Sequence, residues 1–248
     1  MPRFYRLGIK DTDLVSFNVV VKQTNLYIRA QHNLKDKAFK SLLKHRRSLE
    51  GYIQHHPLFL TTLEPYPAEQ NAPAIITEMT TASKIAGTGP MSAVAGAIAE
   101  AVGRDLLLFS PEIIVENGGD IFLKTSKKRL VGIYAGESPL TGKIALEIKP
   151  QETPLGICTS SGTIGHSLSL GCADAAVALS SSTALADAIA TAIGNMVKDI
   201  DAIPQAIEKA KDIPGLYGII IIKDDKMGIW GKVKIVPLAT TSRSKSPR

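Results

Sequence analysis

The order of strand-like and helix-like segments constrains the fold of this chain most. Six short apolar or alternating runs, typical of strands, follow one another at residues 113–115, 121–123, 130–134, 143–148, 156–158 and 175–179. Helical periodicity is grouped on either side of this block, at residues 34–55, 91–102, 183–200 and 205–211. Strands in runs with helices in separate blocks predict an α+β fold, with antiparallel or mixed sheets packed against helices.

The two ends of the chain add further strands. Alternating residues at 15–21 and a short run at 26–29 predict an N-terminal hairpin, and residues 216–222 and 229–235 predict two strands around a turn at 224–228. With 44% hydrophobic residues the chain has enough apolar side chains for a substantial core. We expect a single globular domain over residues 1–238 and a disordered basic tail over residues 239–248.

Two predicted helices consist mainly of small residues. Pro90 suits the first turn of the helix at 91–102, and Gly103 suits its end. In the alanine-rich helix at 184–193, the apolar run is interrupted only by Asp187 and Thr191, four residues apart. This spacing places both oxygens on one helix face, where they could hold Mg²⁺ together with a ligand's phosphates. The alternative is that Asp187 merely stabilises the start of a helix capped by Ser182 or Thr183.

Three loops combine glycine with small oxygen-bearing side chains, a composition that lets backbone N–H groups approach phosphate. The structural alternatives are a helix entry for the first loop and a tight hairpin turn for the second. The candidate ligand-binding residues are Gly87, Thr88, Gly89, Asn117, Gly118, Gly119, Asp120, Thr159, Ser160, Ser161 and Gly162. His166, in the third loop, is the candidate catalytic residue as a general base; the alternative is a loop histidine bonded to backbone.

Composition excludes several classes of protein. The two cysteines, Cys158 and Cys172, are too few for a disulfide framework or a four-cysteine zinc site, and we expect both to be buried. No apolar run approaches the ~20 residues of a membrane span, and no signal-peptide pattern begins the chain, so we expect a cytoplasmic protein without a membrane partner. The net charge of +6 is concentrated at residues 22–47 and in the tail.

Three motifs occur in an order that is more specific than any one of them. They are Glu-Asn-Gly-Gly-Asp-Ile at 116–121, Thr-Ser-Ser-Gly at 159–162 and Ala-Asp-Ala-Ile-Ala-Thr at 186–191. Together they resemble the ApbE superfamily of FAD:protein FMN transferases. The longer match, which includes residues 89–100, 134–140 and 156–167, resembles an uncharacterised ApbE-like family over nearly the whole chain except the tail.

The resemblance implies an ApbE-like fold and a Mg²⁺ site. Asp187 and Thr191 would be the metal ligands, with a backbone carbonyl near residues 86–88 as a third. The superfamily reaction transfers FMN from FAD to a protein threonine and releases AMP. One departure is that the Asp-Pro-x-Thr-Gly stretch expected after the second motif is missing, because the chain runs from His166 through Ser-Leu-Ser-Leu-Gly to the next strand.

We therefore expect Mg²⁺-dependent binding of FAD or a related pyrophosphate nucleotide, with FMN transfer or pyrophosphatase activity. The expected partners are this small-molecule nucleotide and an acceptor protein; the sequence leaves a homo-oligomer open. The alternative is a non-catalytic module that binds nucleic acid or protein through the basic helix, between Lys35 and Arg47. We expect no nucleic-acid partner, because a basic helix face is usually only solvated.

Overall fold

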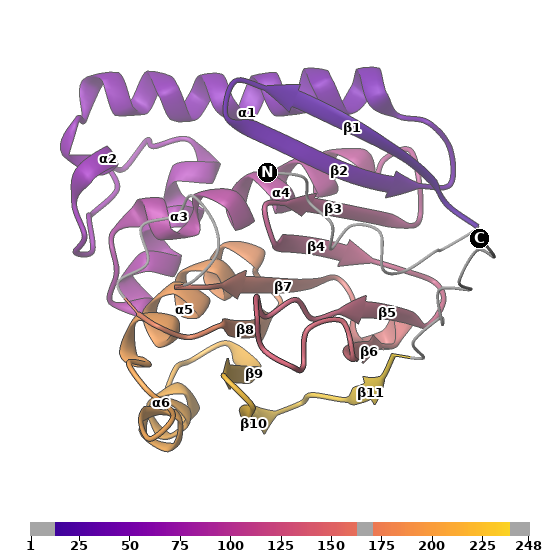
Figure 1. Ribbon diagram of the computed structural model, residues 1–248. Coiled ribbons are helices and arrows are strands. Elements are labelled where there is room, and N and C mark those ends of the chain that lie inside the picture. The colour runs from indigo at the N-terminus through magenta and orange to yellow at the C-terminus, as the bar shows by residue number, and fades with distance from the viewer. Residues whose placement is uncertain (1–12, 163–170, 239–248) are drawn as a thin grey trace, which may run out of the picture.

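The structure, a computed structural model, describes residues 13–162 and 171–238 and is built around an antiparallel sheet (Figure 1). Its eight strands lie in the order β1-β2-β3-β4-β7-β8-β9-β10. In chain order these strands are β1 (Val15–Val21), β2 (Thr24–Ala30), β3 (Ile113–Asn117), β4 (Asp120–Lys124), β7 (Leu155–Ser160), β8 (Ala175–Ser180), β9 (Leu216–Lys223) and β10 (Lys226–Gly231). A second antiparallel sheet has the order β11-β6-β5 and comprises β5 (Arg129–Gly132), β6 (Ile144–Ile148) and β11 (Ile235–Pro237).

Helices cover one face of the large sheet, and the small sheet covers part of the other. The helices are α1 (Lys35–His55), α2 (Leu58–Thr61), α3 (Ala74–Ala86), α4 (Val94–Leu106), α5 (Thr183–Met196) and α6 (Ala202–Lys211), with the 3₁₀ turns η2 (Pro90–Ala93) and η3 (Pro150–Glu152). In β9, Ile219 and Ile221 pack in the core on the helix side, whereas Ile220 and Ile222 pack against the small sheet. A strand buried on both faces explains this continuous apolar run.

The structure confirms the α+β fold class and the antiparallel sheets. The N-terminal hairpin, the basic helix and the six short strands of the central block also occur where the sequence predicts them. The expectation of a disordered tail at 239–248 lies outside the described residues. Within the described ranges no single helix has the length and composition to cross a membrane, and only the pair α3 and η2–α4, bent by 107°, passes that test together.

The structure differs from the sequence prediction in several local features. The helix that the sequence predicts to end at Gly103 continues to Leu106. Gly103 is needed for close packing instead, because a Cβ there would lie 2.1 Å from a ring carbon of Phe122. Residues 229–235 are not one strand, since Gly231 has a φ of 87° and the chain turns from β10 to β11. The short helix α2 and the helix α3 have no counterpart in the prediction. Cys158 is buried as expected, but Cys172 is exposed.

Candidate functional site

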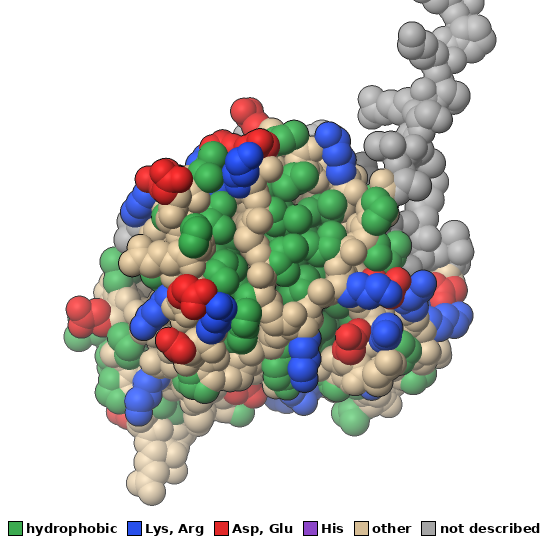
Figure 2. Space-filling model, turned by 90° about the horizontal axis from the view of Figure 1, so that it is seen from below, with side chains coloured by type: hydrophobic (Ala, Val, Ile, Leu, Met, Phe, Trp, Pro, Cys, Tyr) green, Lys and Arg blue, Asp and Glu red, His purple; other side chains and the backbone are tan. Residues whose placement is uncertain are grey.

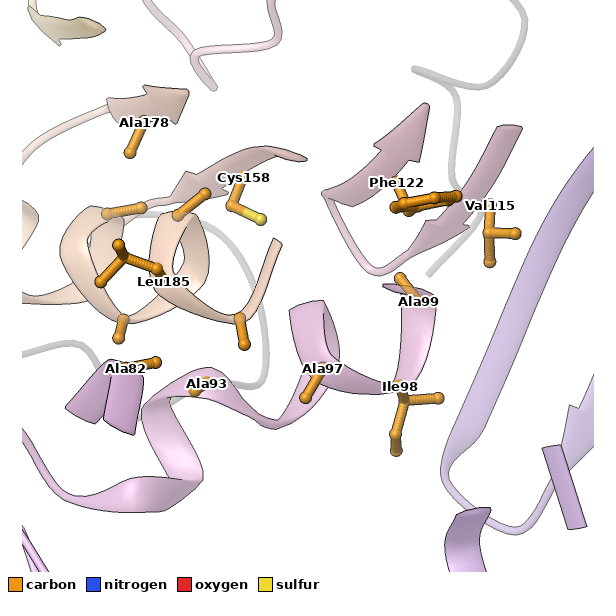
Figure 3. Packing of buried hydrophobic residues seen from close by; sticks show 14 of the residues in the cluster. Ala82, Ala93, Ala97, Ile98, Ala99, Val115, Phe122, Cys158, Ala178 and Leu185 are labelled. Atoms are coloured by element: carbon orange, nitrogen blue, oxygen red, sulfur yellow. The ribbon is translucent and has the colours of Figure 1, made fainter. Parts of the chain in front are cut away.

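The alanine-rich helix α5 lies close to two neighbouring backbones, from η2–α4 on one side and from β7 on the other (Figure 3). Two glycines make this approach possible. A Cβ at Gly96 would lie 2.3 Å from the carbonyl oxygen of Thr183, and a Cβ at Gly156 would lie 2.5 Å from the Cα of the same residue. Because no Cβ fits at either position, both glycines are needed to bring Asp187 up to α4 and β7.

Asp187 binds the N-terminal end of α4. Its Oδ2 accepts a hydrogen bond of 2.8 Å from the backbone N–H of Gly96, and the N–H of Ala95 also donates to this carboxyl. Helix α4 has no side-chain cap of its own. The carboxyl of Asp187 therefore satisfies N–H groups that would otherwise lack partners in the first turn of the helix.

The reverse contact is made by Glu100, a residue of α4 that the sequence analysis did not select. Its Oε2 accepts a hydrogen bond of 2.6 Å from the N–H of Thr183, the first residue of α5, and its Oε1 pairs with Arg104 at 2.5 Å. Each helix thus stabilises the N-terminal end of the other, which fixes their relative position. The available signal in the sequence was a lone carboxylate within the small apolar residues of the helix at 91–102.

The β3–β4 turn lies next to this pair of helices. Asn117 and Asp120 are paired across it, and both intervening glycines have positive φ, 72° at Gly118 and 119° at Gly119, as a two-residue hairpin turn requires. The side-chain amide of Asn117 donates to the carbonyl oxygen of Ala95 at 3.1 Å. The predicted tight turn is therefore present, and Asn117 attaches it to the start of α4.

Asp120 begins β4 and is buried, with 7% of its surface exposed. The thiol of Cys158 and the backbone N–H of Thr159 donate to its carboxyl. The sulfur of Cys158 also lies 3.3 Å from the carbonyl oxygen of Thr183. The first residue of β4, the interior of β7 and the start of α5 consequently meet at one polar cluster. The region around it is otherwise apolar, and Figure 3 shows Cys158 among the buried hydrophobic side chains.

The electrostatics of this cluster are unfavourable for negative charge. Burial raises the pKa of Asp120 to about 7; the thiol of Cys158 opposes the rise, and the carboxyl of Glu116 adds to it. Burial also raises the pKa of Asp187 well above its ordinary range, and the nearby Asp120 raises it further. The pKa of the Cys158 thiol is raised well above normal by burial and then by these two carboxyls, which makes it an unreactive thiol.

Neither Asp120 nor Asp187 forms an ion pair with a lysine, arginine or histidine within the described residues. The same part of the chain holds no group of three or more His, Cys, Asp or Glu side chains placed to bind a metal. Two carboxylates with hydroxyl and carbonyl oxygens nearby do not suit zinc. They suit Mg²⁺, which commonly takes one or two carboxylates and completes its shell with water and substrate phosphates.

The second predicted metal ligand, Thr191, lies one turn beyond Asp187 in α5 and is partly exposed. The predicted helix and its spacing are therefore present. Asp187 also lies within the first turns of α5, as the alternative interpretation required, and the N-cap of this helix is Ser182, whose side chain accepts from the N–H of Leu185 at 3.3 Å. The N–H groups that Asp187 contacts, however, belong to α4.

The first glycine loop is largely engaged in its own contacts. Gly87 ends α3 with a φ of 70°, and the N–H of Thr88 donates to the carbonyl oxygen of Ser83. The hydroxyls of Thr88 and Ser92 lie 2.7 Å apart. Gly89 approaches the backbone of Thr62 so closely that a Cβ would lie 1.9 Å from its oxygen. These contacts fit the helix-entry alternative, with η2 standing between the loop and α4.

The third loop begins at the end of β7. Thr159, Ser160 and Ser161 are partly exposed, and the N–H of Gly162 donates to the carbonyl oxygen of Ala173 at 2.9 Å. His166, the candidate general base, lies outside the described residues. The structure thus brings Asn117, Asp120, Thr159 and Asp187 to the region where α4 and α5 meet, while the loop at 87–89 is held by internal bonds.

The basic helix α1 directs part of its charge towards acidic side chains. Arg46 pairs with Glu50 at 2.7 Å, and His45 contacts Asp105 at 3.0 Å. Lys37 lies 3.8 Å from the centre of the Phe109 ring. None of these contacts involves the cluster around Asp120 and Asp187.

Comparison with known proteins decides the family. A family model described as AbpE bacteria matches residues 7–213. The chain is 42% identical to a UPF0280 protein of Methanocaldococcus jannaschii, over 87% of this chain and 90% of that protein. It is 41% identical to a UPF0280 protein of Methanocella arvoryzae, over 87% and 89% of the two chains. The chain belongs to the UPF0280 family.

The fold of this UPF0280 protein is similar to that of solved ApbE structures. The apo flavinyl transferase ApbE of Pseudomonas stutzeri superimposes with a TM-score of 0.57 and 11% identity, covering 88% of this chain and 94% of that one. The ApbE protein of Thermotoga maritima gives a TM-score of 0.54 at 9% identity, covering 84% and 94%. At such identities the comparison establishes the fold alone, and it confirms the ApbE-like architecture.

Proposed function

We propose that this protein binds Mg²⁺ together with FAD or a related pyrophosphate nucleotide, and that it cleaves the pyrophosphate either by transferring FMN to an acceptor or by hydrolysis. The observation that supports this most is the buried pair Asp120 and Asp187, whose carboxyls have no cationic partner among the described residues and whose pKa values are raised by burial. A bound divalent cation would supply that partner, and it would draw the phosphates of a nucleotide to the same place.

In this proposal Asp187 and Thr191 of α5 would hold the metal, and Asp120 of β4 would supply a second carboxyl near it. The N–H groups of Gly118 and Gly119, in the β3–β4 turn, would contact phosphate or ribose oxygens. Two loops would line the remainder of the nucleotide site. They are the loop of Gly87, Thr88 and Gly89, and the loop that carries the hydroxyls at 159–161 and Gly162. Mg²⁺ would neutralise charge that develops on the phosphates.

The chemistry is a displacement at the phosphorus of the FMN half. An oxygen of an acceptor hydroxyl, or of water, would bond to this phosphorus while its bond to the bridging oxygen breaks, and AMP would leave with that oxygen. The proton of the attacking hydroxyl would pass to a general base, for which His166 remains our proposal. With an acceptor threonine the product is an FMN phosphoester, and with water it is free FMN.

The test is equilibrium binding of FAD to the purified protein with Mg²⁺ and with EDTA, with AMP measured in the same samples. Asp187→Asn keeps the size of the side chain and one acceptor oxygen for Gly96, but it removes the charge. Asp105→Asn, near the other end of α4, is the matched control because its carboxylate contacts Ser41 and His45 instead.

We expect Mg²⁺-dependent binding that Asp187→Asn abolishes and Asp105→Asn retains. Release of AMP would identify an enzyme, and binding without release would limit the proposal to a nucleotide-binding role. Absence of binding to FAD and to other pyrophosphate nucleotides in the wild-type protein would refute the proposal.

A further inference from the structure

Strand β10 forms one edge of the large sheet, and no strand among the described residues pairs with its outer side. The N–H of Lys232, just beyond this strand, donates to the carbonyl oxygen of Tyr217 at 2.7 Å. Because the bonded residues alternate along an antiparallel pair, Gly228 and Trp230 share this orientation towards β9. The backbone N–H and C=O groups of Met227 and Ile229 consequently point away from the sheet.

The side chains on this edge are unusually apolar for an exposed strand. Met227 is 38% exposed and Ile229 is 45% exposed, and the neighbouring Tyr217 in β9 is 39% exposed. A Cβ at Gly228 would lie 2.5 Å from Ile203 of α6, so α6 covers the face opposite to that of Met227 and Ile229. Figure 2, which views the molecule from below, shows hydrophobic side chains gathered in the middle of this surface with charged side chains around them.

We propose that β10 binds β10 of a second copy of this chain, antiparallel and about a two-fold axis, so that the two large sheets become continuous. An unpaired strand with exposed apolar side chains and outward N–H groups is a template for strand addition. A two-fold contact uses the same edge of both copies and therefore closes at a dimer. This inference is independent of the proposed nucleotide chemistry.

The charges at the ends of β10 select one register. Outward-pointing residues must face each other, so the axis passes through a residue of the strand. An axis at Met227 or at Trp230 brings no opposite charges together, which leaves the axes at Gly228 and at Ile229 to compare. With the axis at Gly228, Met227 lies opposite the partner's Ile229, and Asp224 lies opposite the partner's Lys232. With the axis at Ile229, Lys226 would lie opposite the partner's Lys232, and like charges directly opposite are destabilising. The first register is self-complementary in both its apolar and its charged pairs.

The test is sedimentation equilibrium of the full chain across a concentration range. We expect a dimer at about 50 µM chain, and we expect Ile229→Lys to raise the dissociation constant at least about tenfold, since the substitution enters the two-fold interface twice. The matched control is Val20→Lys on β1, the other edge strand, where Val20 is 55% exposed. This control should leave the dissociation constant unchanged.

A charge exchange tests the register itself. Lys232→Glu places a second carboxylate opposite Asp224 of the partner subunit and should weaken the dimer, as should Asp224→Lys alone; the double variant should restore it. Lysine is acceptable at position 224, where φ is 54°, because Lys22 adopts a φ of 51° in the β1–β2 turn. A monomeric wild-type protein, a dimer that survives Ile229→Lys, or a dimer broken by Val20→Lys would each overturn the proposal. Failure of the double variant to restore the dimer would overturn the register.

Discussion

Replacing Asp120 with asparagine should change how the stability of the metal-free protein depends on pH. The ordinary pKa of an aspartic acid is 3.8, whereas burial raises the pKa of Asp120 to about 7. The folded protein therefore holds a proton at Asp120 over a pH range in which the unfolded chain has lost it. Stability from this group is fully present below pH ~4 and is lost as the pH rises to ~7.

The difference between the two pKa values corresponds to about 4 kcal/mol of unfolding free energy, and we take this as an upper limit because Asp120 interacts with Asp187. Asparagine has no charge to bury. The unfolding free energy of Asp120→Asn minus that of the wild type should therefore increase by up to about 4 kcal/mol between pH 4 and pH 7. Urea unfolding followed by circular dichroism, in EDTA, measures this difference.

Glu112→Gln provides the control. Burial raises the pKa of Glu112, but hydrogen bonds from Ser126, Arg129 and Thr125 outweigh it and lower that pKa from 4.5 to about 2. The effect of this substitution should thus be constant between pH 5 and pH 7, and it should change only at lower pH. If the Asp120→Asn difference also stayed constant to within about 1 kcal/mol from pH 4 to pH 7, the raised pKa of Asp120 would be refuted.

Three further predictions concern the elements that hold the site. Gly96→Ala, whose Cβ would lie 2.3 Å from the Thr183 oxygen and 2.8 Å from the Asp187 Cβ, should lower the unfolding free energy by about 1–3 kcal/mol in urea unfolding and weaken Mg²⁺-dependent FAD binding. Gly51→Ala in α1, with open space around it and a helical backbone, should leave that binding intact. Ser182→Ala removes the acceptor for the N–H of Leu185 and should lower stability by about 1 kcal/mol, whereas Ser182→Asp should largely preserve it. Arg129→Leu leaves the buried Glu112 without its ion pair at 2.7 Å and should destabilise the protein by about 3–5 kcal/mol at pH 7. The loss of stability should be clearly smaller near pH 2, where Glu112 takes up its proton. An equal loss at the two pH values would contradict this account.

Much of the architecture follows from patterns that a single sequence displays. The block of short strands and the separate helices predict an α+β fold, and the Gly-Gly dipeptide predicts the two-residue turn that joins β3 to β4. These features arise from local periodicity and turn chemistry, which act within a few residues. The helix α3 escaped prediction because its sequence, Ala-Ile-Ile-Thr-Glu-Met-Thr-Thr-Ala, is rich in β-branched residues of low helix propensity and forms a helix through tertiary packing.

The contacts that assemble the candidate site are not visible in local sequence. Gly103 has the appearance of a helix stop, and only its approach to the Phe122 ring explains why it lies within α4. Glu100 binds the N–H of Thr183, 83 residues away along the chain, and Asp187 binds Gly96, 91 residues away. Such pairings depend on how two helices pack, and a single sequence considered alone provides no signal for them.

The position of Asp187 reconciles the two interpretations that the sequence left open. A carboxylate has two oxygens with about four lone pairs, and Oδ2 accepts from Gly96. The remaining acceptor capacity is sufficient for a cation, so holding the start of α4 and ligating Mg²⁺ do not exclude each other. A buried carboxylate that only capped a helix would not require a second carboxylate beside it, since Asp120 raises the pKa of Asp187 and opposes its charged form. Under the proposed function, a cation bound by both carboxyls would offset this repulsion.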